Sequence, residues 1–148
     1  MRQSHLERWF PNLRTSRYQV TSVATPDYNC IAWAANDDQN WWWPPGGFVG
    51  EYWPSAAPGD RVLESFIAAF ILQGYETCVG DELEASFEKV ALYVDLDGLP
   101  THAARQLGSG TWTSKLGEAE DIEHDTLAAL EGMHYGTVAQ IMRRRMVR

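Results

Sequence analysis

The sequence predicts an α+β fold in which N-terminal helices pack on a small antiparallel sheet and further helices follow at the C-terminus. Three observations predict it. Apolar residues recur at helical spacing over residues 61–74, β-rich runs separated by short turns follow, and two helix-like patterns end the chain. The chain has 148 residues without internal repeats or a low-complexity linker, so we expect one domain over residues 1–148.

Composition narrows the class of partner. The net charge is −8, which disfavours a nucleic acid or an anionic membrane surface. The basic residues at 142–148 are expected to be a solvated helix end rather than a nucleic-acid patch. The N-terminus has no secretory signal and no apolar run reaches transmembrane length, so we expect a cytoplasmic protein, with export by another route and the oligomeric state left open.

Residues 29–35 predict a short, largely buried helix that begins near Cys30. The stretch is mostly apolar, and Asp27 and Asn29 stand just before it as capping candidates. The two cysteines, Cys30 and Cys78, are too few for a disulfide framework and are expected to be thiols. Cys78 lies in a probable strand and is expected to be an ordinary core residue.

Residues 36–60 predict an irregular loop that is rich in tryptophan. Proline and glycine interrupt any long regular element, yet four of the seven tryptophans lie here and should be partly buried: Trp41, Trp42, Trp43 and Trp53. One interpretation is a loop that covers the core with its own aromatic side chains. The other is an aromatic wall or platform beside an active centre, with Trp41, Trp42 and Trp43 as substrate-binding candidates.

The remaining elements follow from periodicity and turn signals. A helix is predicted over residues 61–74, and a short strand over residues 75–79. Three strands over residues 89–95, 101–107 and 110–117 should form an antiparallel meander. Two helices over residues 124–132 and 135–146 should end the chain.

Cys30 and His102 have the residue types that thiol catalysis needs. A helix N-terminus and a nearby imidazolium favour the thiolate, which attacks carbonyl carbon, and a histidine can hold and deliver the proton. His102 is placed at the start of the middle strand of the predicted meander. The alternative is structural, because cysteine is often buried and inert, and a histidine between small residues is often a hydrogen-bonded core residue.

The order of these residues along the chain resembles that of the papain-like cysteine hydrolase superfamily. A cysteine opens a helix, a histidine starts a strand, and a polar residue lies on or after the next strand. The chain is most similar to the compact bacterial branch of cell-wall amidases and endopeptidases. More narrowly, "YNCIAWA", "WWWP", "THAARQL" and "WTSKLG" are similar to an uncharacterised family of bacterial and fungal domains.

This resemblance implies a papain-like fold with Cys30 as nucleophile and His102 as base. The third catalytic residue is expected to be Asp121, with Ser114 and His124 as alternatives. Papain-like proteases carry a glutamine six residues before the cysteine, where this chain has Ala24. That glutamine helps to form the oxyanion hole, and Asn29 is the candidate that replaces it in binding the substrate. The alternative is that backbone N–H groups alone stabilise the oxyanion.

The sequence therefore predicts a thiol-dependent hydrolase (protease, amidase or deamidase) that acts on an amide bond in a peptide or other amide-containing substrate. No cofactor or metal is expected, because metal-ligand spacings such as C-x-x-C and H-x-x-x-H are missing and the glycines at 46–47 do not form a phosphate loop. The alternative is a non-catalytic binding domain that uses the tryptophan-rich loop to bind a peptide or a sugar.

Overall fold

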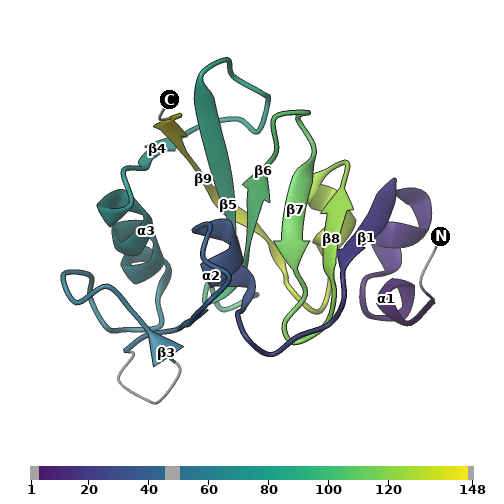
Figure 1. Cartoon of the computed structure of the whole chain (residues 1–148), viewed down its shortest axis with the longest axis horizontal. Coiled ribbons are helices and arrows are strands. Elements are labelled where there is room, and N and C mark those ends of the chain that lie inside the picture. Colours follow the sequence, from purple (N-terminus) through teal and green to yellow (C-terminus); the bar gives the residue numbers. More distant parts are fainter. Residues whose placement is uncertain (1–3, 46–50, 147–148) are drawn as a thin grey trace.

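A seven-stranded antiparallel sheet dominates the computed structural model, which describes residues 4–45 and 51–146 (Figure 1). The strand order across the sheet is β1-β8-β7-β6-β5-β9-β4, so β1 and β4 form its edges. The strands are β1 (Tyr18–Ser22), β4 (Glu76–Cys78), β5 (Phe87–Val94), β6 (Pro100–Gln106), β7 (Trp112–Lys115), β8 (Asp121–His124) and β9 (Thr137–Arg145).

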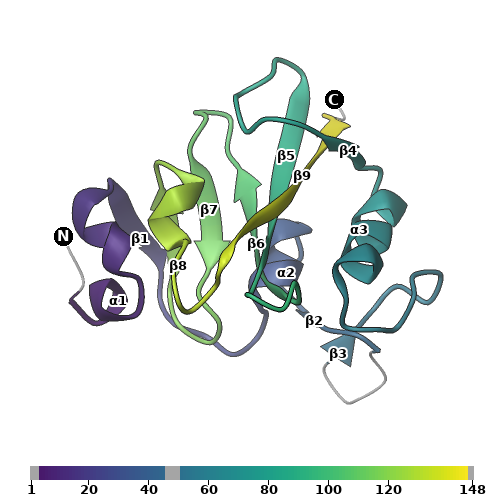
Figure 2. The same cartoon turned by 180° about the vertical axis from the view of Figure 1, so that it is seen from behind.

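Short helices cover the two faces of this sheet. Helices α2 (Cys30–Ala34) and α3 (Leu63–Leu72) contribute to one core, and α2 lies in front of the sheet in Figure 1. The 3-10 helix η2 (Leu127–Leu130) lies on the opposite face, which Figure 2 shows. Helix α1 (Ser4–Trp9) and the 3-10 helix η1 (Pro11–Thr15) contribute to that second core.

Two separate cores result, because successive side chains of a strand point to opposite faces. Along β5, Val90 and Leu92 pack with the buried residues of α2 and α3. Ala91 and Tyr93, which alternate with them, pack with the residues of α1, η1 and η2. The same alternation determines which polar side chains lie on the same face of the sheet and can contact one another.

Several predicted elements are confirmed. Helix α2 begins at Cys30, and Asn29 caps it. Helix α3 lies within the predicted range 61–74, and strands β4, β5, β6 and β7 lie at or near their predicted positions. Strands β5, β6 and β7 form the predicted antiparallel meander.

The predicted fold class is wrong, because the C-terminal third is mainly β-structure and the helices are few and short. In place of a helix over 124–132, strand β8 ends at His124 and a single 3-10 turn, η2, follows. In place of a helix over 135–146, it forms the long strand β9, which pairs with β5 on one side and β4 on the other. The architecture is therefore a sheet with short helices, not helices packed on a small sheet.

Charge pairing explains why the C-terminal segment is a strand. Its arginines meet carboxylates on the two neighbouring strands: Arg143 bonds Glu76 of β4, and Arg144 bonds Glu88 of β5. A helix would have left these basic side chains to interact only with its own C-terminal carbonyl groups. Residues 147–148 of the basic tail lie outside the described residues.

The tryptophan-rich loop carries two short parallel strands, β2 (Trp41–Trp42) and β3 (Glu51–Tyr52). Trp42 and Trp53 are buried, and Trp41 and Trp43 are partly exposed, which confirms the predicted partial burial. Residues 46–50, including the glycines of this loop, lie outside the described residues.

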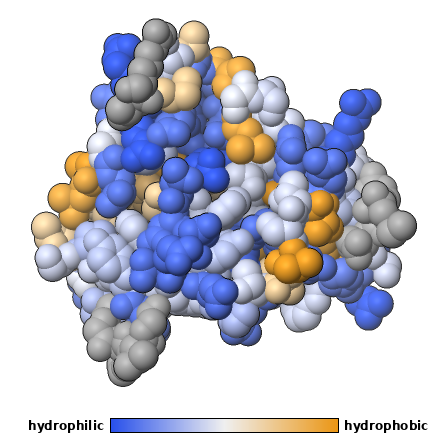
Figure 3. All heavy atoms as spheres, in the orientation of Figure 1, coloured by the Kyte–Doolittle hydropathy of each residue, from blue (hydrophilic) through white to orange (hydrophobic). Residues whose placement is uncertain are grey.

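Surface composition adds two observations. On the face seen in Figure 3, apolar groups are small and separated by polar ones. None of the helices in the described part of the chain is long and apolar enough to cross a membrane.

Candidate functional site

Cys30 is the first residue of α2, and its side chain faces the sheet in the core that α2 shares with β5 and β6. Burial raises the pKa of the thiol to about 11, although the backbone N–H groups of Ala103, Ile31 and Cys30 itself oppose this shift. Cys30 as a whole residue is 7 % exposed, whereas Ile31 and Ala32 are fully buried. At neutral pH the group is therefore a protonated thiol in a nearly closed environment.

Asn29 holds the start of α2 against the tryptophan-rich loop. Its Oδ1 accepts from the backbone N–H of Ala32 at 3.1 Å and of Trp42 at 3.0 Å. Its Nδ2 donates to the carbonyl oxygen of Trp42 at 2.8 Å. Asn29 is 3 % exposed, so the structure gives this predicted substrate-binding side chain a structural position instead.

The predicted tryptophan platform is largely part of the core. Trp42 donates through Nε1 to Asp37 at 2.7 Å. Trp43 packs its ring edge-on against Phe66 of α3, with the centroids 5.5 Å apart. Trp41 and Trp43 are the members of the WWW run that keep partial exposure, so only their outer surfaces are accessible to a ligand.

Cys30 and His102 lie on opposite faces of the sheet. Ala103 and its cross-strand partner Leu92 pack in the same core as Cys30. His102 and its partner Tyr93 face the other core, where the two rings meet at 5.2 Å. The structure therefore does not bring the predicted nucleophile and base together, although Ala103, which follows His102, shares the core of Cys30 and its backbone N–H favours the thiolate.

His102 instead belongs to a buried hydrogen-bond chain. His124 Nδ1 lies 2.8 Å from the carbonyl oxygen of Thr126, and its Nε2 lies 2.8 Å from Ser114 Oγ. Ser114 Oγ lies 2.9 Å from His102 Nε2. All three side chains are at most 1 % exposed.

The hydrogen bonds assign the protons of this chain. A carbonyl only accepts, so Nδ1 of neutral His124 carries a proton and its Nε2 accepts from the Ser114 hydroxyl. Ser114 then accepts from His102 Nε2–H, which leaves His102 Nδ1 as an acceptor without a partner among the described residues. The ring of His102 also stacks on Tyr135, at 4.2 Å.

Burial keeps both imidazole rings neutral. It lowers the pKa of His102 well below its usual value and lowers the pKa of His124 to about 4. Ser114 and His124, the alternatives for the third catalytic position, thus contact His102 and not Cys30.

Asp121, the predicted third catalytic residue, lies on the same face of the sheet as Cys30. Its Oδ2 accepts from the hydroxyl of Tyr28 at 2.7 Å and of Ser22 at 2.6 Å. Its Oδ1 is buried without a partner among the described residues. The residue is fully buried, and its cross-strand partner on β7 is Lys115.

A family model for a domain of unknown function, DUF7689, matches residues 19–143. The chain belongs to the DUF7689 family. No curated protein and no solved structure matches the chain.

Lys115 of this DUF7689 domain is a candidate that the sequence did not single out. Its side chain is fully buried, and its ammonium group lies 5.4 Å from the centre of the Tyr28 ring. It donates to the carbonyl oxygens of Gly117 and Ala119. Strand alternation in "WTSKLG" places Lys115 and Ser114 on opposite faces of the sheet. The sequence does not show which face carries α2, so alternation alone could not place Lys115 on the side of Cys30.

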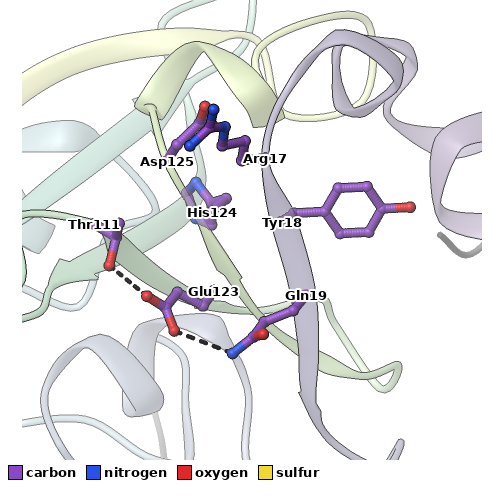
Figure 4. Close-up of a pocket in the computed structure, with 7 residues that line it drawn as sticks. All are labelled: Arg17, Tyr18, Gln19, Thr111, Glu123, His124 and Asp125. Carbon is purple, nitrogen blue, oxygen red and sulfur yellow. Dashed lines mark hydrogen bonds between the residues drawn. The ribbon is translucent and has the colours of Figure 1, made fainter. Parts of the chain in front are cut away.

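A shallow pocket at the β1 edge of the DUF7689 domain is separate from these groups (Figure 4). Glu123 accepts there from Thr111 at 2.7 Å and from Gln19 at 3.5 Å, and Arg17 and Asp125 lie at the far end. Of the predicted catalytic residues and their alternatives, only His124 lines it. Among residues 4–45 and 51–146, no three His, Cys, Asp or Glu side chains are grouped to hold a metal ion.

Proposed function

We propose that this domain is a thiol-dependent hydrolase of amide bonds in which Cys30 is the nucleophile. The observation that carries the proposal is the position of Cys30 as the first residue of α2, where the backbone N–H groups of Cys30, Ile31 and Ala103 favour the thiolate. Two come from the start of α2 and one from β6, so both the helix and the sheet fix their positions. Such donors also suit the oxyanion that forms when a carbonyl group is attacked.

The reaction takes two steps. The thiol gives its proton to water, the thiolate adds to the amide carbonyl carbon, and the C–N bond breaks as the amine takes a proton from water, which leaves a thioester on Cys30. Water then cleaves the C–S bond, releases the carboxylic acid and restores the thiol. A protease, an amidase and a deamidase share this chemistry, so a peptide or another amide-containing molecule is the proposed substrate.

The buried thiol predicts an alkaline pH dependence. Because burial raises the pKa of Cys30 to about 11, each pH unit below that value lowers the thiolate fraction about tenfold. Hydrolysis should therefore increase with pH up to the limit of protein stability. A profile that falls above about pH 8 would show that another group controls the reaction.

His102 keeps its predicted role as base only as a hypothesis, since it faces away from Cys30. The variant His102→Gln tests it, because glutamine retains a polar side chain and cannot act as a base. We expect this variant to leave the thiol pKa unchanged. Loss of hydrolysis in a folded His102→Gln variant would restore the predicted Cys-His pair.

The first experiment is the rate of iodoacetamide alkylation of Cys30 between about pH 7 and about pH 11, read by peptide mass spectrometry. Cys78 of β4 is more exposed and serves as the internal control. Hydrolysis of casein and of peptide p-nitroanilides is then compared in wild type, Cys30→Ala and Cys78→Ala. We expect only Cys30→Ala to lose hydrolysis, with an unchanged urea midpoint.

A non-catalytic binding domain is the second candidate, and the near-complete burial of Cys30 favours it. Trp41 and Trp43 retain the partial exposure that stacking on a peptide or a sugar requires. Alkylation of Cys30 only after unfolding would support this candidate over the hydrolase.

The proposed thiol chemistry fits the cytoplasm, where reducing conditions keep a free cysteine as a thiol. The net charge of −8 makes a nucleic acid or an anionic membrane an unfavourable partner.

A further inference from the structure

Lys115 is a fully buried cation on the face of the sheet that carries Cys30. Arg105 of β6 is a partly buried cation against Trp33 of α2 on the same face. Helix α2 packs on β6 and β7, and Lys115 is the last residue of β7. Tyr28, two residues before Cys30, lies beneath the ammonium group at 5.4 Å. The electrostatic effects between Lys115 and Cys30 are mutual, since the cation favours the thiolate and the thiolate favours the cation.

Several groups fix Lys115 in this position. Two of its three N–H bonds point at the carbonyl oxygens of Gly117 and Ala119, which favours the charged form. The aromatic face of Tyr28 attracts the same charge. Burial lowers the pKa of Lys115, and the nearby carboxylate of Asp121 opposes that shift.

Asp121 connects this cation to the segment that precedes Cys30. It accepts from the Tyr28 hydroxyl at 2.7 Å and is the cross-strand partner of Lys115. Its second oxygen, Oδ1, is fully buried and unpartnered among the described residues. A buried carboxylate with one free oxygen remains stable only where positive charge lies close by.

We propose that Lys115 is a positioning residue whose ammonium group stabilises the thiolate of Cys30, and that Asp121 and Tyr28 hold Lys115 in place. The cation thereby has the electrostatic role that the sequence assigned to His102. Other charged groups that act on Lys115 are Glu118 and Glu120, both in the turn between β7 and β8. This role rests on the proposed function of Cys30 for its catalytic meaning, but it is measured on the thiol itself.

The chain offers a matched control. Lys89 is the second fully buried lysine, and its charge acts on Cys78 as that of Lys115 acts on Cys30. The experiment therefore compares the alkylation rates of both cysteines against pH in Lys115→Met and Lys89→Met. Methionine approximates the length of lysine and removes the charge.

We expect Lys115→Met to slow the alkylation of Cys30 about three- to tenfold at a pH below its pKa and to leave Cys78 unchanged. Lys89→Met should slow the alkylation of Cys78 and leave that of Cys30 unchanged. Loosened packing would have the reverse effect on Cys30, because exposure lowers a raised thiol pKa towards about 8.5. Slower alkylation therefore separates lost charge from lost structure.

If Lys115→Met does not fold, a second pair of variants tests whether the charge of Lys115 stabilises the thiolate of Cys30. Lys115→Arg keeps the charge and should retain the wild-type profile of Cys30. Asp121→Asn keeps an acceptor for Tyr28 and Ser22 but removes the carboxylate that holds Lys115 in its charged form, so Cys30 should react more slowly. A wild-type profile in folded Lys115→Met, or in Asp121→Asn, overturns the role of Lys115.

The two proposals fail in different measurements. The role of Lys115 depends on alkylation rates, which need no substrate. The hydrolase proposal depends on amide hydrolysis that is lost in Cys30→Ala. A charge effect of Lys115 on Cys30 without any hydrolysis would therefore retain the first and reject the second.

Discussion

Ser114 Oγ lies 2.8 Å from Nε2 of His124 and is the central member of a buried hydrogen-bond chain that ends at His102. The hydroxyl donates to one imidazole ring and accepts from the other, so neither histidine can be replaced or charged without leaving a buried group unpaired. The chain joins β6, β7 and β8 in the core opposite Cys30. Its properties predict how the fold responds to mutation and to acid.

Ser114→Ala should destabilise the protein by about 2–4 kcal/mol, because it leaves His102 Nε2–H and His124 Nε2 buried without partners. Urea unfolding at pH 7 measures the loss. Ser109→Ala is the control, since Ser109 is exposed and its hydroxyl lies 2.7 Å from that of Thr111, also on the surface turn before β7. Equal stabilities of the two variants would contradict the assigned hydrogen-bond chain.

Acid should destabilise the fold through the same histidines. In the unfolded chain a histidine has a pKa of about 6.5, whereas burial lowers the pKa of His124 to about 4 in the folded protein. The unfolded state therefore binds more protons between these values, and stability falls as pH falls through this range. His102, whose pKa burial also lowers, acts in the same direction.

The measurement is the free energy of unfolding at several pH values between about 7 and about 4. His124→Gln should reduce the slope by up to about 1.4 kcal/mol per pH unit, the contribution of one proton. Ser109→Ala, at an exposed position that carries no titratable group, is the control and should retain the wild-type slope. Equal slopes in wild type and His124→Gln would show that His124 is already charged in the folded state.

Asn29→Ala should cost about 2–4 kcal/mol of stability. It removes the cap of α2 and leaves the backbone N–H and carbonyl of Trp42 without their partner. Asn40→Ala, at an exposed position in the same loop, should cost about 0.5 kcal/mol or less. If Asn29→Ala instead lowers only amide hydrolysis, the side chain binds substrate as the sequence predicted.

Gly136→Ala should destabilise the loop between η2 and β9 more than Gly98→Ala destabilises the turn between β5 and β6. Both glycines have positive φ, 75° and 79° respectively, so both variants introduce backbone strain. Only at Gly136 would the added Cβ overlap the carbonyl oxygen of Val94. Thermal unfolding should show a clearly lower midpoint for Gly136→Ala, and similar midpoints would argue against this close approach.

Local sequence signals determined much of the molecule. The asparagine before an apolar run set the start of α2 at Cys30, because a side chain that caps a helix needs only its own neighbours. Apolar spacing likewise defined α3, and alternation with turn residues defined β5, β6 and β7. The burial of the tryptophan side chains was also predictable, since a long loop in a small domain has to bury its aromatic surface.

The C-terminal segment was decided by tertiary contacts. Over residues 137–145 the apolar residues fit a helix about as well as a strand, and the arginines suit a helix end. Strand β9 forms because β5 and β4 offer both backbone partners and carboxylates for those arginines. These partners lie tens of residues away in the sequence, where local periodicity does not register them.

The candidate site was decided in the same way. The sequence by itself determined that a cysteine opens a helix and that a histidine lies near the start of a strand. Only the tertiary structure decided which face of the sheet each side chain occupies, because a shift of one residue along a strand moves a side chain to the other face. Ala103 therefore shares the core of Cys30 while His102 faces Ser114, and Lys115 is a fully buried cation on the side of the thiol.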